Sequence, residues 1–161
     1  MRTPIEICLE RDRNRSRKVG FEVIDRYVRR YEFPQKFEGF SQIIIDDDPI
    51  EDISIVEKRF YELLEDMKDW DQCNPHHIHC LYDHAYLLAD HFQKNSCEFY
   101  AGILHDVGKM IVGFFDDQGI AHYYNHDSVG TYYILSKLYP FLTSILNQEN
   151  IEYLFEGEKE D

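Results

Sequence analysis

Long hydrophobic runs and basic residues are both scarce in this chain, and the two shortages exclude several classes of protein. Apolar runs such as Ile43-Ile44-Ile45 are far too short to span a bilayer, because a spanning helix needs about 20 consecutive apolar residues. Lys and Arg number 17 against 31 Asp and Glu, so the formal net charge is −14. A surface this acidic repels nucleic acid. We therefore expect no membrane span and no general binding of DNA or RNA.

Paired cysteines and an apolar signal core are not found either. No two of the four cysteines form a Cys-x-x-Cys pair, and residues 1–18 are studded with Arg, Glu and Asp. With 161 residues, the chain can build one domain around a hydrophobic core without disulfides. We expect reduced thiols and a cytoplasmic location. The cysteines are Cys8, Cys73, Cys80 and Cys97.

A helical pattern dominates what is present. Hydrophobic residues make up 43% of the chain, with 11 Phe and 12 Tyr to fill a core. Apolar side chains recur every three or four positions in several segments, as in amphipathic helices. The pattern predicts helices over residues 18–31, 53–67, 76–92, 98–104, 126–138 and, in one or two pieces, 141–155. In the helix over 76–92, Leu81, Leu87 and Leu88 are expected to be buried.

The segments between these helices have characters of their own. Residues 1–16 are polar and arginine-rich, and are expected to be poorly ordered or an arm. Residues 35–50 are typical of a linker, where Asp46-Asp47-Asp48 is a solvated cluster near a helix start. We therefore divide the chain into an N-terminal arm and helix, residues 1–50, and a main helical domain, residues 51–161, with which the N-terminal helix packs as one unit.

One β excursion is expected near residues 110–124. Two aromatic and β-branched runs, 110–115 and 120–124, flank Asp116-Asp117-Gln118-Gly119, which is typical of a small hairpin or an extended lobe. Asn125 is expected to cap the following helix and Pro140 to end it. Gly108 is expected to let the chain turn after the helix over 98–104. The predicted fold class is mainly all-α with this small β excursion.

Histidines and one carboxylate indicate metal chemistry. Six of the eight histidines lie within residues 76–105, and Leu104-His105-Asp106-Val107-Gly108-Lys109 sets an imidazole and a carboxylate beside a cation. These ligand types suit divalent ions such as Mn, Mg, Ni, Co, Zn or Fe. His77, His84 and His91 are seven residues apart and so share one helix face. We expect His84 to reach a shared ion, His91 to lie on the surface, and His76 and His79 to point elsewhere.

Four segments resemble, in order and spacing, the HD superfamily of metal-dependent phosphohydrolases. Their motifs are closest to the HD domains attached to tRNA nucleotidyltransferases. The resemblance covers residues 68–155 and implies a compact all-α bundle of five or more helices. The segments are Gln72-Cys-Asn-Pro75-His-His77, Leu81-Tyr-Asp-His84, Ala101-Gly-Ile-Leu-His105-Asp106-Val-Gly108-Lys109 and Tyr123-Tyr-Asn-His126-Asp127-Ser-Val-Gly130.

The resemblance also implies roles for individual residues. A divalent metal would be bound by His84, His105 and Asp106. Lys109 would lie near a phosphate and act with Asp106 and His126 in catalysis. His122 would line the substrate or, with His126, bind a second ion, and His77 would stand at the rim of the substrate site.

One departure from the family leaves the ligand set open. The family takes a fourth ligand from an Asp on a late helix, and residues 139–160 contain no Asp. Either His126 or Asp127 replaces that ligand, or the site is incomplete.

We expect a phosphohydrolase of a small phosphate ester, with a nucleotide as the favoured substrate and homo-oligomers allowed. The alternatives are a catalytically impaired module that binds a nucleotide or a partner, and a di-iron oxygenase of HD fold.

Overall fold

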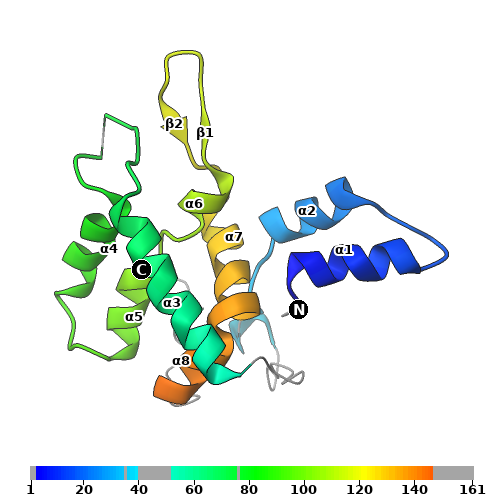
Figure 1. Cartoon of the computed structure of the whole chain (residues 1–161), viewed down its shortest axis with the longest axis horizontal. Helices are drawn as coiled ribbons and strands as arrows, with labels where there is room; N and C mark the ends of the chain where they lie inside the picture. The colour runs from blue at the N-terminus through cyan, green and yellow to red at the C-terminus, as the bar shows by residue number, and fades with distance from the viewer. Residues whose placement is uncertain (1–2, 35, 40–51, 76, 147–161) are drawn as a thin grey trace.

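The computed structural model describes residues 3–34, 36–39, 52–75 and 77–146, and the description below concerns these residues. The fold is mainly helical with one small antiparallel sheet, which confirms the expected fold class (Figure 1). No described helix has the length and apolar character needed to cross a membrane. The elements are α1 (Ile5–Asn14), α2 (Phe21–Arg29), the 3-10 turn η1 (Lys36–Glu38), α3 (Ile53–Lys68), α4 (Leu81–Ala89), α5 (Cys97–Leu104), α6 (Lys109–Val112), β1 (Phe114–Phe115), β2 (Ala121–His122), α7 (His126–Tyr133), the π-helical segment η2 (Ile134–Leu138) and α8 (Tyr139–Ile145).

The core is built on α3. This helix begins where Asp52 accepts the Ser54 main-chain N–H at 3.0 Å, a side-chain cap. It ends one residue beyond the predicted segment. Its apolar stripe packs against α4, η2 and α8, and each large side chain buried there contributes about 1.5–3 kcal/mol. The stripe consists of Val56, Phe60, Leu63 and Met67.

Helix α4 differs from the prediction in length and in its buried face. It begins at Leu81, five residues after the predicted start. Leu87 and Leu88 are 54% and 42% exposed, so the expectation that they are buried is wrong. The buried side chains are Leu81, Ala85 and Ala89. Small residues are required here because a Cβ on Gly102 of α5 would lie 2.8 Å from the Ala89 Cα, so α4 and α5 pack almost backbone to backbone.

Gly108 ends the expected turn, residues 105–108, between α5 and α6. Its φ of −63° and ψ of −21° are ordinary helical values, so glycine is needed here for close packing and not for its backbone freedom. A Cβ on Gly108 would lie 1.9 Å from the His126 carbonyl oxygen and 2.7 Å from the Gly130 N. The absence of side chains on Gly108 and Gly130 therefore lets α6 lie directly on α7. This contact brings the start of α7 next to the segment that follows α5.

The expected hairpin is present but shorter than the pattern suggested. Strands β1 and β2 are antiparallel, with Phe114 opposite His122, whereas residues 109–112 form helix α6. Asn125 stands at the start of α7 with a left-handed φ of 61° and makes no side-chain cap. Pro140 lies in the first turn of α8, so it begins a helix instead of ending the previous one.

The N-terminal residues form a helical hairpin that projects from the body (Figure 1). Residues 5–14, for which a poorly ordered segment or an arm was expected, form helix α1. Asp12 joins α1 to α2 by accepting the main-chain N–H groups of Val19 and Gly20, each at 2.9 Å. The arm meets the body through α2 and α7. A small apolar cluster lies there, made of Val28, Val112, Val129 and Tyr132.

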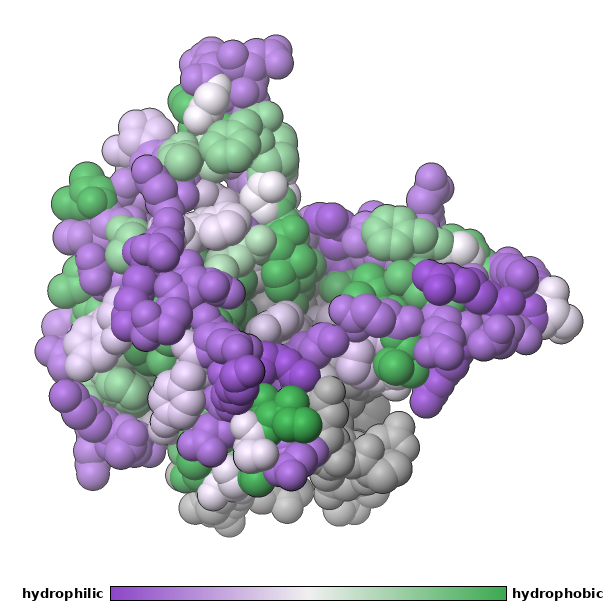
Figure 2. All heavy atoms as spheres, viewed as in Figure 1, coloured by the Kyte–Doolittle hydropathy of each residue, from purple (hydrophilic) through white to green (hydrophobic). Residues whose placement is uncertain are grey.

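Some predictions fall outside the described residues. These are the carboxylates of the expected linker, His76 and the end of the chain from residue 147. Figure 2 shows hydrophilic residues over much of the visible face, including the tip of the hairpin.

We predict that Asp12→Asn destabilises the protein at neutral pH. The main-chain N–H groups of Val19 and Gly20 hold the pKa of Asp12 below its ordinary 3.8. A lowered folded-state pKa gives stability that is present above the unfolded pKa and lost as pH falls through the folded pKa. Urea midpoints of wild type and Asp12→Asn should therefore differ at pH 7 and converge below about pH 4. A difference that does not change with pH would contradict this account, and Asp25→Asn, which loses only a pair with Arg29, serves as control.

A second prediction concerns the contact between α6 and α7. In Gly108→Ala the new Cβ meets main-chain atoms that cannot rotate away, so we expect a loss of about 1–3 kcal/mol in the free energy of unfolding. Gly113→Ala is the matched control, because its Cβ would be 3.1 Å from its nearest neighbours. Equal free energies of unfolding of the two variants in urea titrations would show that the close backbone contact at Gly108 does not hold α6 against α7.

Candidate metal centre

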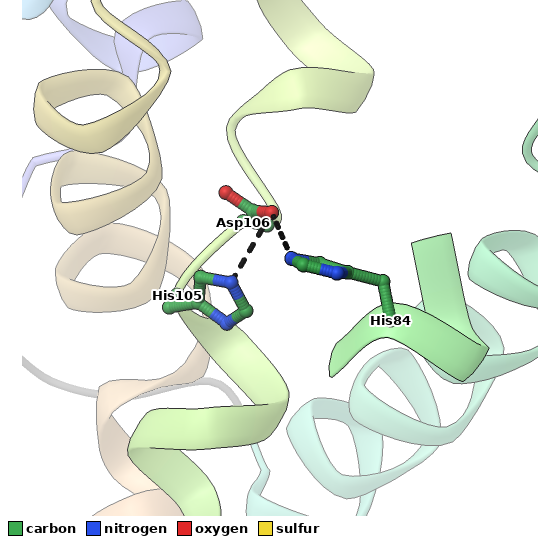
Figure 3. Close-up of side chains that lie close together, drawn as sticks. All are labelled: His84, His105 and Asp106. Atoms are coloured by element: carbon green, nitrogen blue, oxygen red, sulfur yellow. Dashed lines mark ion pairs between the residues drawn. The ribbon is translucent and has the colours of Figure 1, made fainter. Parts of the chain in front are cut away.

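Three side chains, one from a helix and two from the turn after the next helix, converge in the structure. His84 comes from α4, whereas His105 and Asp106 follow the end of α5 (Figure 3). Each offers one ligand atom, and these atoms all lie within 4.8 Å of one another. Consecutive residues on a helix project about 100° apart, which lets His105 stay partly exposed while Asp106 is buried. The predicted convergence of these three residues is found in the structure.

The Asp106 carboxylate is the hub of the site. Its Oδ2 lies 3.2 Å from the Nε2 atoms of both His84 and His105, and 2.7 Å from the Lys109 Nζ. Its Oδ1 lies 3.2 Å from the Nε2 of His126, the first residue of α7. Asp106 is only 4% exposed. Three imidazoles and one ammonium thus surround a single buried carboxylate.

The tautomers of two histidines follow from their other ring nitrogen. The Nδ1 of His105 lies 2.8 Å from the Gly102 carbonyl oxygen, and the Nδ1 of His126 lies 2.8 Å from the Tyr123 carbonyl oxygen. A carbonyl oxygen only accepts, so each Nδ1 carries the proton and donates it. In the neutral ring, each Nε2 then directs a lone pair at Asp106. A lone pair and a carboxylate repel each other, so this arrangement is favoured when a cation lies between them or when the imidazoles take up a second proton.

This is the donor set that metal ions use. Histidine ligands usually donate their second ring N–H to a main-chain carbonyl or a carboxylate, which fixes the ring and exposes the other nitrogen to the metal. His105 satisfies this condition, and His84 and Asp106 complete a group of two nitrogens and one oxygen. The three residues could therefore hold a metal ion. His126 stands on the other carboxylate oxygen and is not part of this group.

Electrostatics within the site keep the carboxylate ionised. Burial alone would raise the pKa of Asp106, but hydrogen bonds from His105, His126 and Lys109 outweigh it and hold this pKa well below its ordinary value. Burial lowers the pKa of His105, yet its contacts with Asp106 raise the net value. The hydrogen bond to Asp106 raises the pKa of His126. The pKa of His84 is lowered, first by burial and then by neighbouring positive charge.

Lys109 is held inside the protein. It is 5% exposed, and its Nζ donates to the Gln72 Oε1 at 2.9 Å in addition to its contact with Asp106. Gln72 is itself fully buried and donates to the His79 carbonyl oxygen at 3.1 Å. The Tyr123 hydroxyl donates to the Gln72 carbonyl oxygen. These bonds fix Lys109 on Asp106, and its expected approach to a phosphate stays a prediction.

The remaining residues predicted for the site lie outside the group of His84, His105 and Asp106. The ring of His77 is 5.7 Å from that of His84, although His77 precedes α4 and does not share its helix. His122 lies on β2 and pairs with Asp116 at 2.9 Å, outside the three-residue group. Asp127 is exposed on the first turn of α7. His79 and His91 are exposed as well.

Two residues of the site were missed as functional residues at the sequence level. Gln72 and Tyr123 both fall in the quoted motifs, but an amide or a phenol side chain does not by itself indicate a functional site in a sequence. Their importance comes from burial and from contacts between segments about 50 residues apart.

Comparisons with known proteins add no family to this description. No protein-family model, curated protein or solved structure matches the chain. The resemblance to HD phosphohydrolases therefore stays an expectation drawn from the motifs, and the case for the site rests on its own geometry.

We predict that Lys109→Met strongly destabilises the protein in the absence of added metal. Removing one partner of a buried ion pair costs about 3–5 kcal/mol, because the other charge is left without compensation. Lys137→Met is the matched control, since Lys137 pairs with Glu6 near the surface and such pairs contribute about 0–1 kcal/mol. The measurement is the free energy of unfolding of each variant and of wild type, from urea titrations in the presence of a chelator. Similar losses in both variants would mean that Lys109 does not neutralise Asp106.

Proposed function

We propose that the chain is a metal-dependent phosphohydrolase of the HD type that acts on a small phosphate ester, with a nucleotide as the favoured substrate. One observation carries the proposal. The Nε2 atoms of His84 and His105 converge on a buried carboxylate, with Nδ1 of His105 already donated to a carbonyl. This donor set, together with the motif around His105-Asp106, favours metal-assisted hydrolysis over a purely structural role.

The charge of the site supports an anionic substrate. Asp106 and Lys109 sum to zero (−1 + 1), so neutral imidazoles leave the centre without net charge. A divalent ion would then give the site a net charge of about +2. That local charge matches the dianion of a phosphate monoester, although the whole chain carries −14. Substrate attraction would thus come from the site alone.

Individual residues take distinct roles in this proposal. A bound divalent ion would polarise a phosphoryl oxygen and lower the pKa of a coordinated water. His84, His105 and Asp106 would hold the ion, and Asp106 would also orient the water. His126 has a side chain that is 35% exposed, so its imidazole can hold or deliver a proton at a phosphoryl oxygen. Lys109 would act as a positioning residue that fixes the Asp106 carboxylate.

A binding module without turnover is the second candidate. The specific observation in its favour is α8, the last described helix, which carries no carboxylate to serve as a late ligand. Calorimetry with a nucleoside monophosphate and Mn²⁺ separates the two, because the module would bind without releasing phosphate. The di-iron alternative would take extra ligands from His122 and His126. His126 does contact Asp106, but His122 pairs with Asp116 on the hairpin.

The test is phosphate release from nucleoside monophosphates and a simple aryl phosphate with Mn²⁺, Co²⁺, Ni²⁺ or Mg²⁺. We expect turnover that a chelator abolishes. Loss of a group that hydrogen-bonds to a metal ligand costs about 10–100-fold, so Asp106→Asn, which would alter a ligand itself, should lower kcat/KM by at least that factor. His91→Ala, an exposed histidine just beyond α4, is the matched control and should keep full activity. Equal turnover in Asp106→Asn and wild type, or no turnover with any ion, would overturn the proposal.

A further inference from the structure

A small cavity adjoins the metal centre on the side of α7. Its volume is about 170 Å³, and it shares His105 with the three-residue metal group. The cavity lies between the end of α5 and one face of α7, is open to solvent on one side, and is also lined by the first residue of η2. The lining residues are Ala101, Leu104, His105, Asp127, Thr131 and Ile134.

The lining combines two polar side chains with an apolar wall. Asp127 and Thr131 are four residues apart on α7, so they lie one above the other on the same helix face. The carboxylate accepts hydrogen bonds, and the hydroxyl can donate and accept. Ile134, at the start of η2, continues this side of the cavity, and Leu104 at the end of α5 supplies further aliphatic surface. A ligand that suits this lining carries hydroxyl groups on a short carbon skeleton.

We propose that this cavity binds the alcohol part of the substrate, and that this part is a sugar or similar polyol carrying a single phosphate. The inference rests on the proposed function, because His105 belongs both to the metal group and to the cavity lining, so the cavity adjoins the place where the phosphate would bind. Asp127 and Thr131 would then bind the hydroxyl groups. A second phosphate in the cavity would meet the Asp127 carboxylate, and like charges repel strongly at short range.

The volume limits what can enter. One water molecule occupies about 30 Å³ of liquid, so the cavity of about 170 Å³ takes the volume of a single small ring or a short chain. A sugar ring matches this volume, whereas a sugar and a base together exceed it. In a nucleotide the base would therefore lie outside the cavity.

The experiment compares ribose 5-phosphate with pentyl phosphate, which has the same number of carbons and no free hydroxyl group. Kinetics and calorimetry are run on the protein with Mn²⁺. A hydrogen bond to a charged group contributes enough for about a tenfold to hundredfold preference, so wild type should favour ribose 5-phosphate by that factor. In Asp127→Ala and Thr131→Val the preference should fall toward one. Ser128→Ala, on the same helix but outside the lining, should keep it.

The outcomes separate this inference from the proposed function. If neither ester is hydrolysed, the proposed function fails, while the ratio of the two dissociation constants still tests the cavity. Equal affinities of wild type for the two esters would overturn the cavity proposal even if both are hydrolysed. Loss of bound Mn²⁺ in Asp127→Ala would also overturn it, because Asp127 would then be a metal ligand. Weaker binding of ribose 1,5-bisphosphate than of ribose 5-phosphate, relieved in Asp127→Ala, would support it.

Discussion

The buried carboxylate of Asp106 is the constraint around which the rest of the structure is arranged. An isolated charge at this depth would be costly, because burial in a low-dielectric interior disfavours ionised groups. The protein offsets that cost with the Lys109 ammonium at 2.7 Å, and three imidazole nitrogens at 3.2 Å stabilise the carboxylate further once they share a cation or a proton with it. Those partners come from α4, the end of α5, the start of α6 and the start of α7. The helices must therefore meet closely at one point.

Small residues make that meeting possible. Gly102 on α5 and Ala89 on α4 allow one close contact, while Gly108 and Gly130 allow the other between α6 and α7. The first contact packs the helix of His84 against the helix that ends at Asp106. The second brings the first residue of α7 to the opposite carboxylate oxygen. The same two close backbone contacts therefore both pack the helices together and bring the side chains of the site to one place.

Sequence patterns predicted the elements that depend on local information. The stripe on α3 repeats at helical spacing, and the turn between the two aromatic runs is marked by its own residues, so both could be recognised from sequence. The buried face of α4 could not, because Leu87 is intrinsically a better core residue than Ala85 and only the approach of α5 selects the small side chain. The turn that ends at Gly108 was predicted, but its packing role was not, because the approach of α7 is likewise a tertiary contact. The three residues that could hold a metal ion were recognisable from residue type and motif, whereas Gln72 acts through a tertiary contact that leaves no local pattern.

The most direct test of the central claim is the metal content of protein purified without chelator and dialysed against Co²⁺. The account predicts about one ion per chain in wild type, from one convergent ligand set, with a Co²⁺ absorption spectrum that reports nitrogen ligands. His105→Ala should contain almost none, and His91→Ala should match wild type. Wild-type protein without bound metal, or metal retained in full by His105→Ala, would contradict the claim that these imidazoles and Asp106 hold a common ion.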